Sequence, residues 1–157
     1  MADRPIPAFR KTGDLLLIGT MAIYDSQPQA SEQIPQQWRE FLRTNPALGS
    51  STQFYGASPC TGDRKIHYLT GVAQQSAEDV VGGELLTLAA GEYAVVRVDD
   101  KALLRDTWTW LLGSWLPQSG QREMRAPEFE RYTGISEDGL PVGPVEIWIP
   151  LEPVAGS

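Results

Sequence analysis

The order of secondary-structure signals runs twice along this chain, and the repeat constrains the fold more than any other feature. Each half carries a strand-like run, then an amphipathic helical stretch, then two further strand-like segments. Similar residues in corresponding segments recur at a constant spacing of 77 positions: Tyr55 and Tyr132, Trp38 and Trp115, Ile18 and Val95. Internal similarity at a fixed spacing indicates a duplicated βαββ unit.

The local signals place the elements of each half. In the first half we predict a strand from Asp14 to Tyr24, a helix capped by Ser31 that ends near Asn45, and strands from Gln53 to Ser58 and from Arg64 to Gln75. In the second half we predict strands from Leu85 to Leu88 and from Glu92 to Asp99, a helix from Leu103 to Leu116 that stops at Pro117, and strands from Phe129 to Thr133 and from Val145 to Leu151.

This order predicts an α+β fold in one domain over residues 1–157. The first βαββ unit covers about 8–76 and the second about 84–152. We expect an antiparallel sheet with two helices packed against it, and a pseudo-twofold axis that relates the halves. A ligand cleft is expected between the halves, because small-molecule sites favour concave regions with aromatic walls.

Charge and composition exclude several classes of function. The net charge of −7 argues against nucleic-acid binding, since such proteins neutralise phosphates with basic surfaces. Arginines 122, 125 and 131 are interleaved with glutamates 123, 128 and 130, which we interpret as a solvated, salt-bridged surface. No apolar run approaches the roughly 20 residues of a membrane span. Cys60 is the only cysteine, and we expect a cytoplasmic location.

The segment from Pro144 to Pro150 contains the strongest candidate for a site. On a strand, Glu146 and Trp148 share one face, while the three aliphatic residues between the prolines share the other. A carboxylate beside an indole suits a flat cationic ligand, because both groups attract positive charge. A half-exposed strand with no ligand explains the same pattern equally well.

Other chemistries find little support in the sequence. His67 is the only histidine, no clustered cysteines are present, and no GxSxG nucleophile motif occurs. We therefore expect neither a metal site nor a bound cofactor.

Seven segments, in order, resemble the GyrI-like small-molecule-binding domain, the effector-binding domain of AraC-type and MerR-type activators with a SOUL-like fold. They are 34–38 (IPQQW), 54–56 (FYG), 68–72 (YLTGV), 88–95 (LAAGEYAV), 115–120 (WLPQSG), 129–132 (FERY) and 145–150 (VEIWIP). The resemblance implies a duplicated βαββ fold whose central pocket binds hydrophobic, often cationic compounds. It also implies a signature acid in the last strand, which maps onto Glu146.

The candidate pocket residues are Glu146, Trp148, Tyr68, Tyr55 and Trp110, with the Tyr68 hydroxyl placed to hydrogen-bond Glu146. Trp110 lies off the apolar stripe of its helix, so we expect it at the edge of the cleft. Tryptophans 38, 108 and 115 are interpreted as core residues between helix and sheet.

Three functions remain open from the sequence. The first is a stand-alone domain that senses or sequesters a small hydrophobic or cationic ligand. The second is a hydrolase of reactive cyclopropane-type electrophiles, in which Glu146 and Tyr68 act as the acid–base pair. The third is a protein that binds a protein partner, such as a gyrase-inhibitory protein or one that works with a separate DNA-binding subunit. A homodimer is also compatible with the sequence.

Overall fold

A computed structural model describes residues 6–45, 53–59, 61–73, 83–136 and 140–153. Cys60 and the expected strand end at Gln75 lie outside these ranges. In chain order the elements are β1 (Ala8–Thr12), β2 (Leu15–Tyr24), α1 (Gln27–Thr44), β3 (Phe54–Ser58), β4 (Ile66–Ala73), β5 (Glu84–Leu88), β6 (Gly91–Val98), α2 (Leu104–Trp110), α3 (Leu116–Ser119), β7 (Glu128–Ile135) and β8 (Pro141–Pro150).

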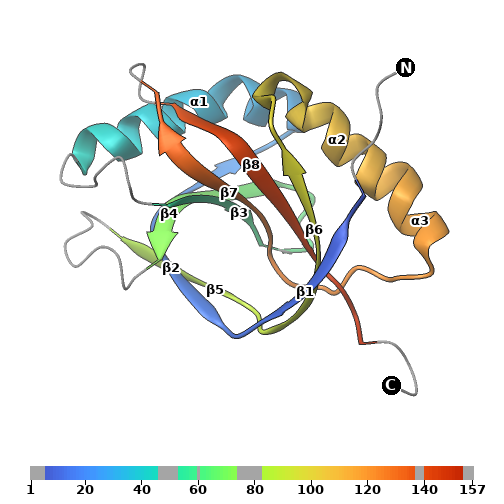
Figure 1. Cartoon of the computed structure of the whole chain (residues 1–157). Coiled ribbons are helices and arrows are strands. Elements are labelled where there is room, and N and C mark those ends of the chain that lie inside the picture. Colours follow the sequence, from blue (N-terminus) through green and yellow to red (C-terminus); the bar gives the residue numbers. More distant parts are fainter. Residues whose placement is uncertain (1–5, 46–52, 60, 74–82, 137–139, 154–157) are drawn as a thin grey trace.

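One antiparallel sheet contains all eight strands, in the order β1-β6-β8-β7-β3-β4-β2-β5. The order is symmetric about the β7–β3 contact, so β2-α1-β3-β4 corresponds to β6-α2-α3-β7-β8. Each short strand pairs with a strand of the other half of the chain: β1 pairs with β6, and β5 pairs with β2. The predicted α+β fold with a duplicated βαββ order is therefore confirmed (Figure 1).

The first helix begins earlier than the sequence predicts. Ser26, and not Ser31, is the N-cap, because its side chain accepts a hydrogen bond from the Gln29 N–H at 3.2 Å. Pro28 in the first turn lacks an N–H that would need a partner there. Ser31 is thereby placed within the helix, where its side chain is available to a neighbouring element.

The second helix continues beyond the predicted stop at Pro117. A π-helical turn at Leu111–Trp115 joins α2 to α3, and Pro117 lies in the first turn of α3. The segment ends at Gly120, whose φ of 80° is a left-handed conformation that favours glycine. Pro117 is tolerated because the hydrogen-bond pattern has already changed at the π-helical turn.

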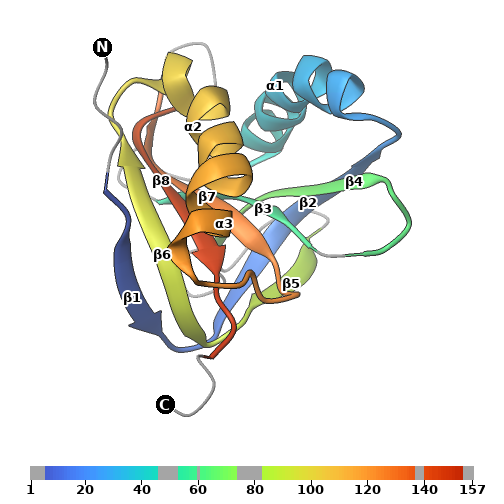
Figure 2. The same ribbon diagram turned by 90° about the vertical axis from the view of Figure 1, so that its right-hand side faces the viewer.

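The helices cover one face of the sheet, and the sheet curls around its other face (Figure 2). On the covered face, Trp38 and Phe41 of α1 pack on Tyr68 and Tyr132, while α2 and α3 pack on residues of β6 and β8. The opposite face encloses a second core contributed by strands alone, including Tyr55, Phe129 and Trp148.

Residues 77 positions apart lie in corresponding elements of the two halves, but they do not always lie on the same face of the sheet. Tyr132 packs against Trp38 beneath α1 at 5.6 Å between ring centroids, whereas Tyr55 packs against Phe129 on the opposite face at 5.9 Å. Phe54, the cross-strand partner of Tyr132, lies on the same face as Tyr132 and also contacts Trp38 edge-on, at 6.3 Å between ring centroids. An odd error in register moves a strand residue to the other face.

Candidate functional site

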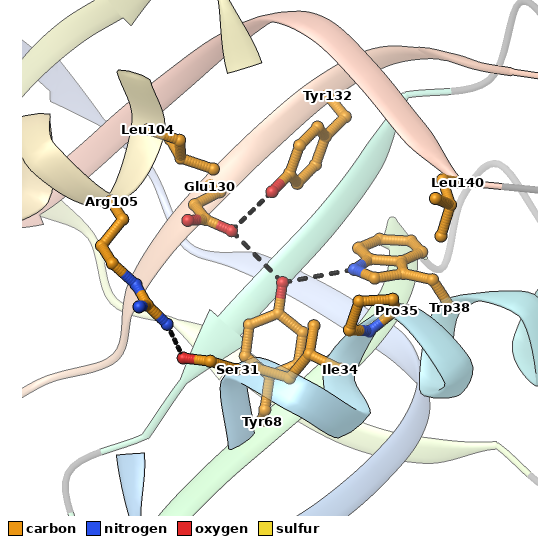
Figure 3. Close-up of a pocket in the computed structure, with 10 residues that line it drawn as sticks. All are labelled: Ser31, Ile34, Pro35, Trp38, Tyr68, Leu104, Arg105, Glu130, Tyr132 and Leu140. Carbon is orange, nitrogen blue, oxygen red and sulfur yellow. Dashed lines mark hydrogen bonds between the residues drawn. The ribbon is translucent and has the colours of Figure 1, made fainter. Parts of the chain in front are cut away.

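A pocket of about 220 Å³ opens on the helix-covered face. It lies between α1 and the start of α2, above strands β4 and β7 (Figure 3). Aromatic and aliphatic side chains dominate its wall. The residues that line it are Ser31, Ile34, Pro35, Trp38, Tyr68, Leu104, Arg105, Glu130, Tyr132 and Leu140.

Among the described lining residues Glu130 of β7 is the only carboxylate, and it accepts hydrogen bonds from a tryptophan and two tyrosines. The Trp108 indole N–H donates to Oε2 at 2.6 Å, and the hydroxyls of Tyr132 and Tyr68 donate to Oε1 at 2.7 Å and 3.2 Å. These donors offset part of the desolvation of a carboxylate in an aromatic pocket.

The two tyrosines remain hydrogen-bond donors because their environment opposes ionisation. Burial raises the pKa of Tyr68 and of Tyr132 well above the ordinary 10, and the negative charge of Glu130 raises both further. Each phenol therefore keeps its proton at physiological pH. The pair can hold the carboxylate in place, but neither is adjusted to give up a proton readily.

Tyr68 is held over the sheet by a glycine and by α1. A Cβ at Gly56 of the neighbouring strand β3 would lie 1.9 Å from the Tyr68 hydroxyl oxygen, so only glycine leaves room for this ring. The Trp38 indole N–H approaches the same hydroxyl at 3.4 Å. Tyr68 thus connects the floor of the pocket to the helix that forms its wall.

A buried glutamine fixes α1 to the sheet beneath the pocket. Gln37 donates through Nε2 to the backbone carbonyls of Thr20 and Tyr68 at 3.0 and 2.8 Å, and its Oε1 accepts from the Tyr24 hydroxyl at 2.6 Å. The adjacent Trp38 is consequently held in a fixed orientation. Because its polar atoms are satisfied, this buried amide positions the helix without leaving orphaned groups.

The rim carries a charge of the opposite sign. Arg105 of α2 is exposed, and its guanidinium donates to the Ser31 hydroxyl of α1 (Figure 3). This contact joins the two helices beside the pocket.

The five residues predicted from sequence are divided by the sheet. Tyr68 lines the helix-side pocket, where it donates to Glu130 instead of the expected Glu146. Tyr55, Glu146 and Trp148 lie on the other face, where Tyr55 and Trp148 belong to the strand-only core. The sheet therefore separates Tyr68 from the acid with which it was grouped.

Glu146 and Trp148 do share a face and touch, with the indole N–H donating to the carboxylate at 3.2 Å. Glu146 also forms ion pairs with Arg131, which lies directly opposite on β7, and with Arg10 at 3.8 Å. Both guanidiniums lie within 6 Å of the Trp148 ring centroid, at 5.5 Å for Arg131 and 5.9 Å for Arg10. Positive charge from the protein itself therefore already occupies the surroundings that suggested a cation site.

Trp110 does not line the pocket, since it packs against the core beneath the second helix. Trp108, which was expected to be a core residue only, is the member of this helix that reaches Glu130.

Glu130 was missed because its neighbours in sequence carry alternating charges. On β7, residues 128, 130 and 132 face the helices, while Arg131 points to the opposite face and pairs with Glu146. The interpretation of this segment as a solvated surface is therefore wrong at Glu130. The available signal was the period of two, which places Glu130 on the same face as Tyr132.

The comparison with protein families identifies the group to which this arrangement belongs. Residues 16–151 match the model of the integron-associated effector binding protein, Cass2. The chain belongs to this family. The match supports small-molecule binding as the general role of this effector-binding domain and is consistent with the resemblance to GyrI-like domains. No curated protein matches the sequence significantly.

Solved structures share the fold of this effector-binding domain. SAV2435 bound to tetraphenylphosphonium has a TM-score of 0.72 at 20% identity, covering 93% of each chain. An integron cassette protein from the mobile metagenome of Vibrio cholerae has a TM-score of 0.71 at 14% identity, covering 93% of this chain and 95% of that one. The C-terminal domain of EcmrR has a TM-score of 0.62 at 14% identity, covering 96% and 99%.

The described residues contain neither a membrane-spanning helix nor a cluster of metal ligands. None of the helices in the described ranges is long and apolar enough to cross a membrane. Within the same part of the chain, no group of three or more His, Cys, Asp or Glu side chains is arranged to hold a metal ion.

Proposed function

We propose that this effector-binding protein captures organic cations with an aromatic or hydrophobic body in the pocket between α1 and α2. The observation that carries the proposal is the position of Glu130, a carboxylate in an aromatic pocket that Tyr68, Trp108 and Tyr132 hold in place by hydrogen bonds. A cation in this pocket is attracted by the carboxylate, and the attraction is stronger in an apolar pocket than in water. Trp38, Tyr68 and Tyr132 offer aromatic surface around it.

The energetic contribution of such a site is substantial. A desolvated cation over an aromatic face gains about 0.5–2 kcal/mol for each favourable contact. An interaction with a partly buried carboxylate contributes about 1.5–3 kcal/mol more. The neighbouring structure of SAV2435 holds tetraphenylphosphonium, a cation of this class, and supports the choice of ligand.

The test compares a cation with a neutral compound of similar shape. Titration calorimetry with tetraphenylphosphonium and with triphenylphosphine oxide should show clear preference for the cation in the wild type. Glu130→Gln should lower the affinity for the cation about tenfold or more and leave the affinity for the neutral compound nearly unchanged. Glu146→Gln is the matched control, because it changes the same chemical group on the opposite face. Equal affinity of Glu130→Gln and wild type for the cation would refute the proposal.

A second candidate is hydrolysis of a strained electrophile at the same carboxylate. Glu130 and the two tyrosine hydroxyls form a compact hydrogen-bonded group at the pocket, and a carboxylate in that setting can orient a water molecule. Binding is favoured over hydrolysis because the phenols hold their protons firmly. Incubation with a cyclopropane-containing electrophile should give multiple turnover that Glu130→Gln abolishes. Binding at one equivalent without product would argue against catalysis.

A further inference from the structure

Among the described residues that line the pocket, one carries a negative charge and one a positive charge. Glu130 is partly buried between Tyr68, Tyr132 and Trp108, whereas Arg105 is exposed. Figure 3 shows the Arg105–Ser31 contact on one side of the pocket and Trp38 on the other, with Glu130 between them. Of these two charged side chains, Arg105 is therefore the more accessible to a ligand that approaches from solvent.

Arg105 is poorly suited to a pocket that takes simple cations only. A guanidinium stays charged at physiological pH, so it repels a cation that passes it and reduces the net negative charge of the pocket. Its contact with Ser31 holds it beside the opening without neutralising it, because a hydroxyl carries no charge. The planar guanidinium presents several N–H donors, and its geometry matches a carboxylate.

We propose that the preferred ligands are zwitterions: an aromatic body with a cationic group at Glu130 and a carboxylate that Arg105 binds at the rim. This inference rests on the proposed cation site and specifies its ligand class. The carboxylate of the ligand would replace Ser31 as the partner of Arg105 or share the guanidinium with it. Each charged group of the ligand then lies beside a protein group of opposite charge. Arg105 attracts the carboxylate of such a ligand, whereas it repels a ligand that is only a cation.

A purely structural role for Arg105 makes a different prediction. If the arginine only joins α2 to α1 through Ser31, then removing either partner should affect all ligands alike. Ser31→Ala breaks that contact and keeps the guanidinium, whereas Arg105→Gln removes the charge. The two variants together separate charge recognition from helix coupling.

The experiment uses two ligands of nearly identical shape, 4-(trimethylammoniomethyl)benzoate and 4-(trimethylammoniomethyl)benzamide. The benzoate is a zwitterion and the benzamide a cation, and the two differ only in the group that would face Arg105. Affinities are measured by calorimetry or NMR titration at low salt for wild type, Arg105→Gln, Arg105→Lys, Ser31→Ala and Glu130→Gln. Arg39→Gln, an exposed arginine of α1 outside the pocket lining, serves as the control.

We expect the wild type to bind the benzoate about fivefold more tightly than the benzamide, the scale of one partly exposed ion pair. Arg105→Gln should abolish that preference, Arg105→Lys should keep part of it, and Ser31→Ala and Arg39→Gln should keep it. Equal affinity of the wild type for both ligands, or an unchanged preference in Arg105→Gln, would overturn the inference. If Glu130→Gln still abolished binding of both ligands in that case, the cation site itself would stand. Undiminished binding of both ligands by Glu130→Gln would overturn the cation site and this inference together.

Discussion

The indole N–H of Trp108 donates to Oε2 of Glu130 at 2.6 Å and thereby links the second helix to the acid of the pocket floor. Its counterpart on the first helix, Trp38, approaches the Tyr68 hydroxyl, which itself donates to Glu130. Both helices therefore meet the sheet through a tryptophan that contributes to one hydrogen-bonded group. The pocket and the packing of the helices depend on the same contacts.

Replacing Trp108 with Phe should weaken this link while keeping an aromatic ring in place. The partly buried carboxylate of Glu130 would lose a hydrogen-bond donor, and hydrogen bonds to charged groups contribute about 1.5–3 kcal/mol. We expect the free energy of unfolding, measured in urea, to fall by about that amount. The affinity for the cation should also change, because Glu130 is the acid of the pocket. Trp115→Phe is the control, since Trp115 packs against Phe9 away from the pocket. A loss of similar size in both variants would mean that ring volume, and not the N–H donor, matters.

Gly56→Ala should disturb the pocket from beneath. The new methyl group would lie 1.9 Å from the Tyr68 hydroxyl oxygen, so the ring must shift and its hydrogen bond to Glu130 would be disturbed. Overpacking of this kind costs about 1–3 kcal/mol of stability. Cation affinity measured by calorimetry should fall as well. In a Tyr68→Val background, where the ring is absent, the same glycine change should cost much less; an equal cost would show that the clash is not with Tyr68.

The ion pair on the opposite face should affect stability without affecting the pocket. Glu146→Gln keeps an acceptor for the Trp148 indole but leaves Arg131 without its charged partner. Because the two side chains are only 18% and 27% exposed, we expect a loss of about 1–2 kcal/mol in urea unfolding. Affinity for tetraphenylphosphonium should match the wild type. A tenfold loss of that affinity would return Glu146 to the binding site.

Glu128 should make the stability of the protein depend on pH. Burial, followed by its hydrogen bond to Glu123 and the charges of Glu123 and Glu130, raises the pKa of Glu128 to about 8, from an ordinary value near 4.5. Between these values the unfolded chain has released a proton that the folded chain retains, so the contribution of this group falls as pH rises from about 4.5 to about 8. The total change is on the order of a few kcal/mol.

Glu128→Gln provides the measurement of that effect. The amide cannot ionise, so the variant should gain stability relative to the wild type at pH 8 compared with pH 5, as measured by urea unfolding at both values. Glu152→Gln, at a position exposed near the C-terminal end of the described chain, is a control with no expected change. A difference between Glu128→Gln and wild type that is the same at both pH values would contradict the raised pKa.

Local patterns in the sequence are sufficient to predict the kinds of element and their order. The apolar run of β2, the helical spacing around Trp38 and the turn residues between strands act over a few residues, and each predicted element exists in the structure. Errors arose at helix ends, where Ser26 and Ser31 offer the same capping chemistry and only the path of the chain decides between them. The short strand β1 was not predicted, because its five residues are all exposed and carry no apolar face.

The tertiary structure alone decided which acid belongs to the pocket. Alternation along a strand shows that Glu146 and Trp148 share a face, as Glu130 and Tyr132 do, and both statements hold in the structure. Alternation does not show which of these faces the helices cover. That choice depends on strand order and register among residues far apart in the chain, which place Arg131 opposite Glu146 and bring Trp108 to Glu130. The period of a strand is a local property, whereas the side on which a helix packs is fixed by the whole sheet.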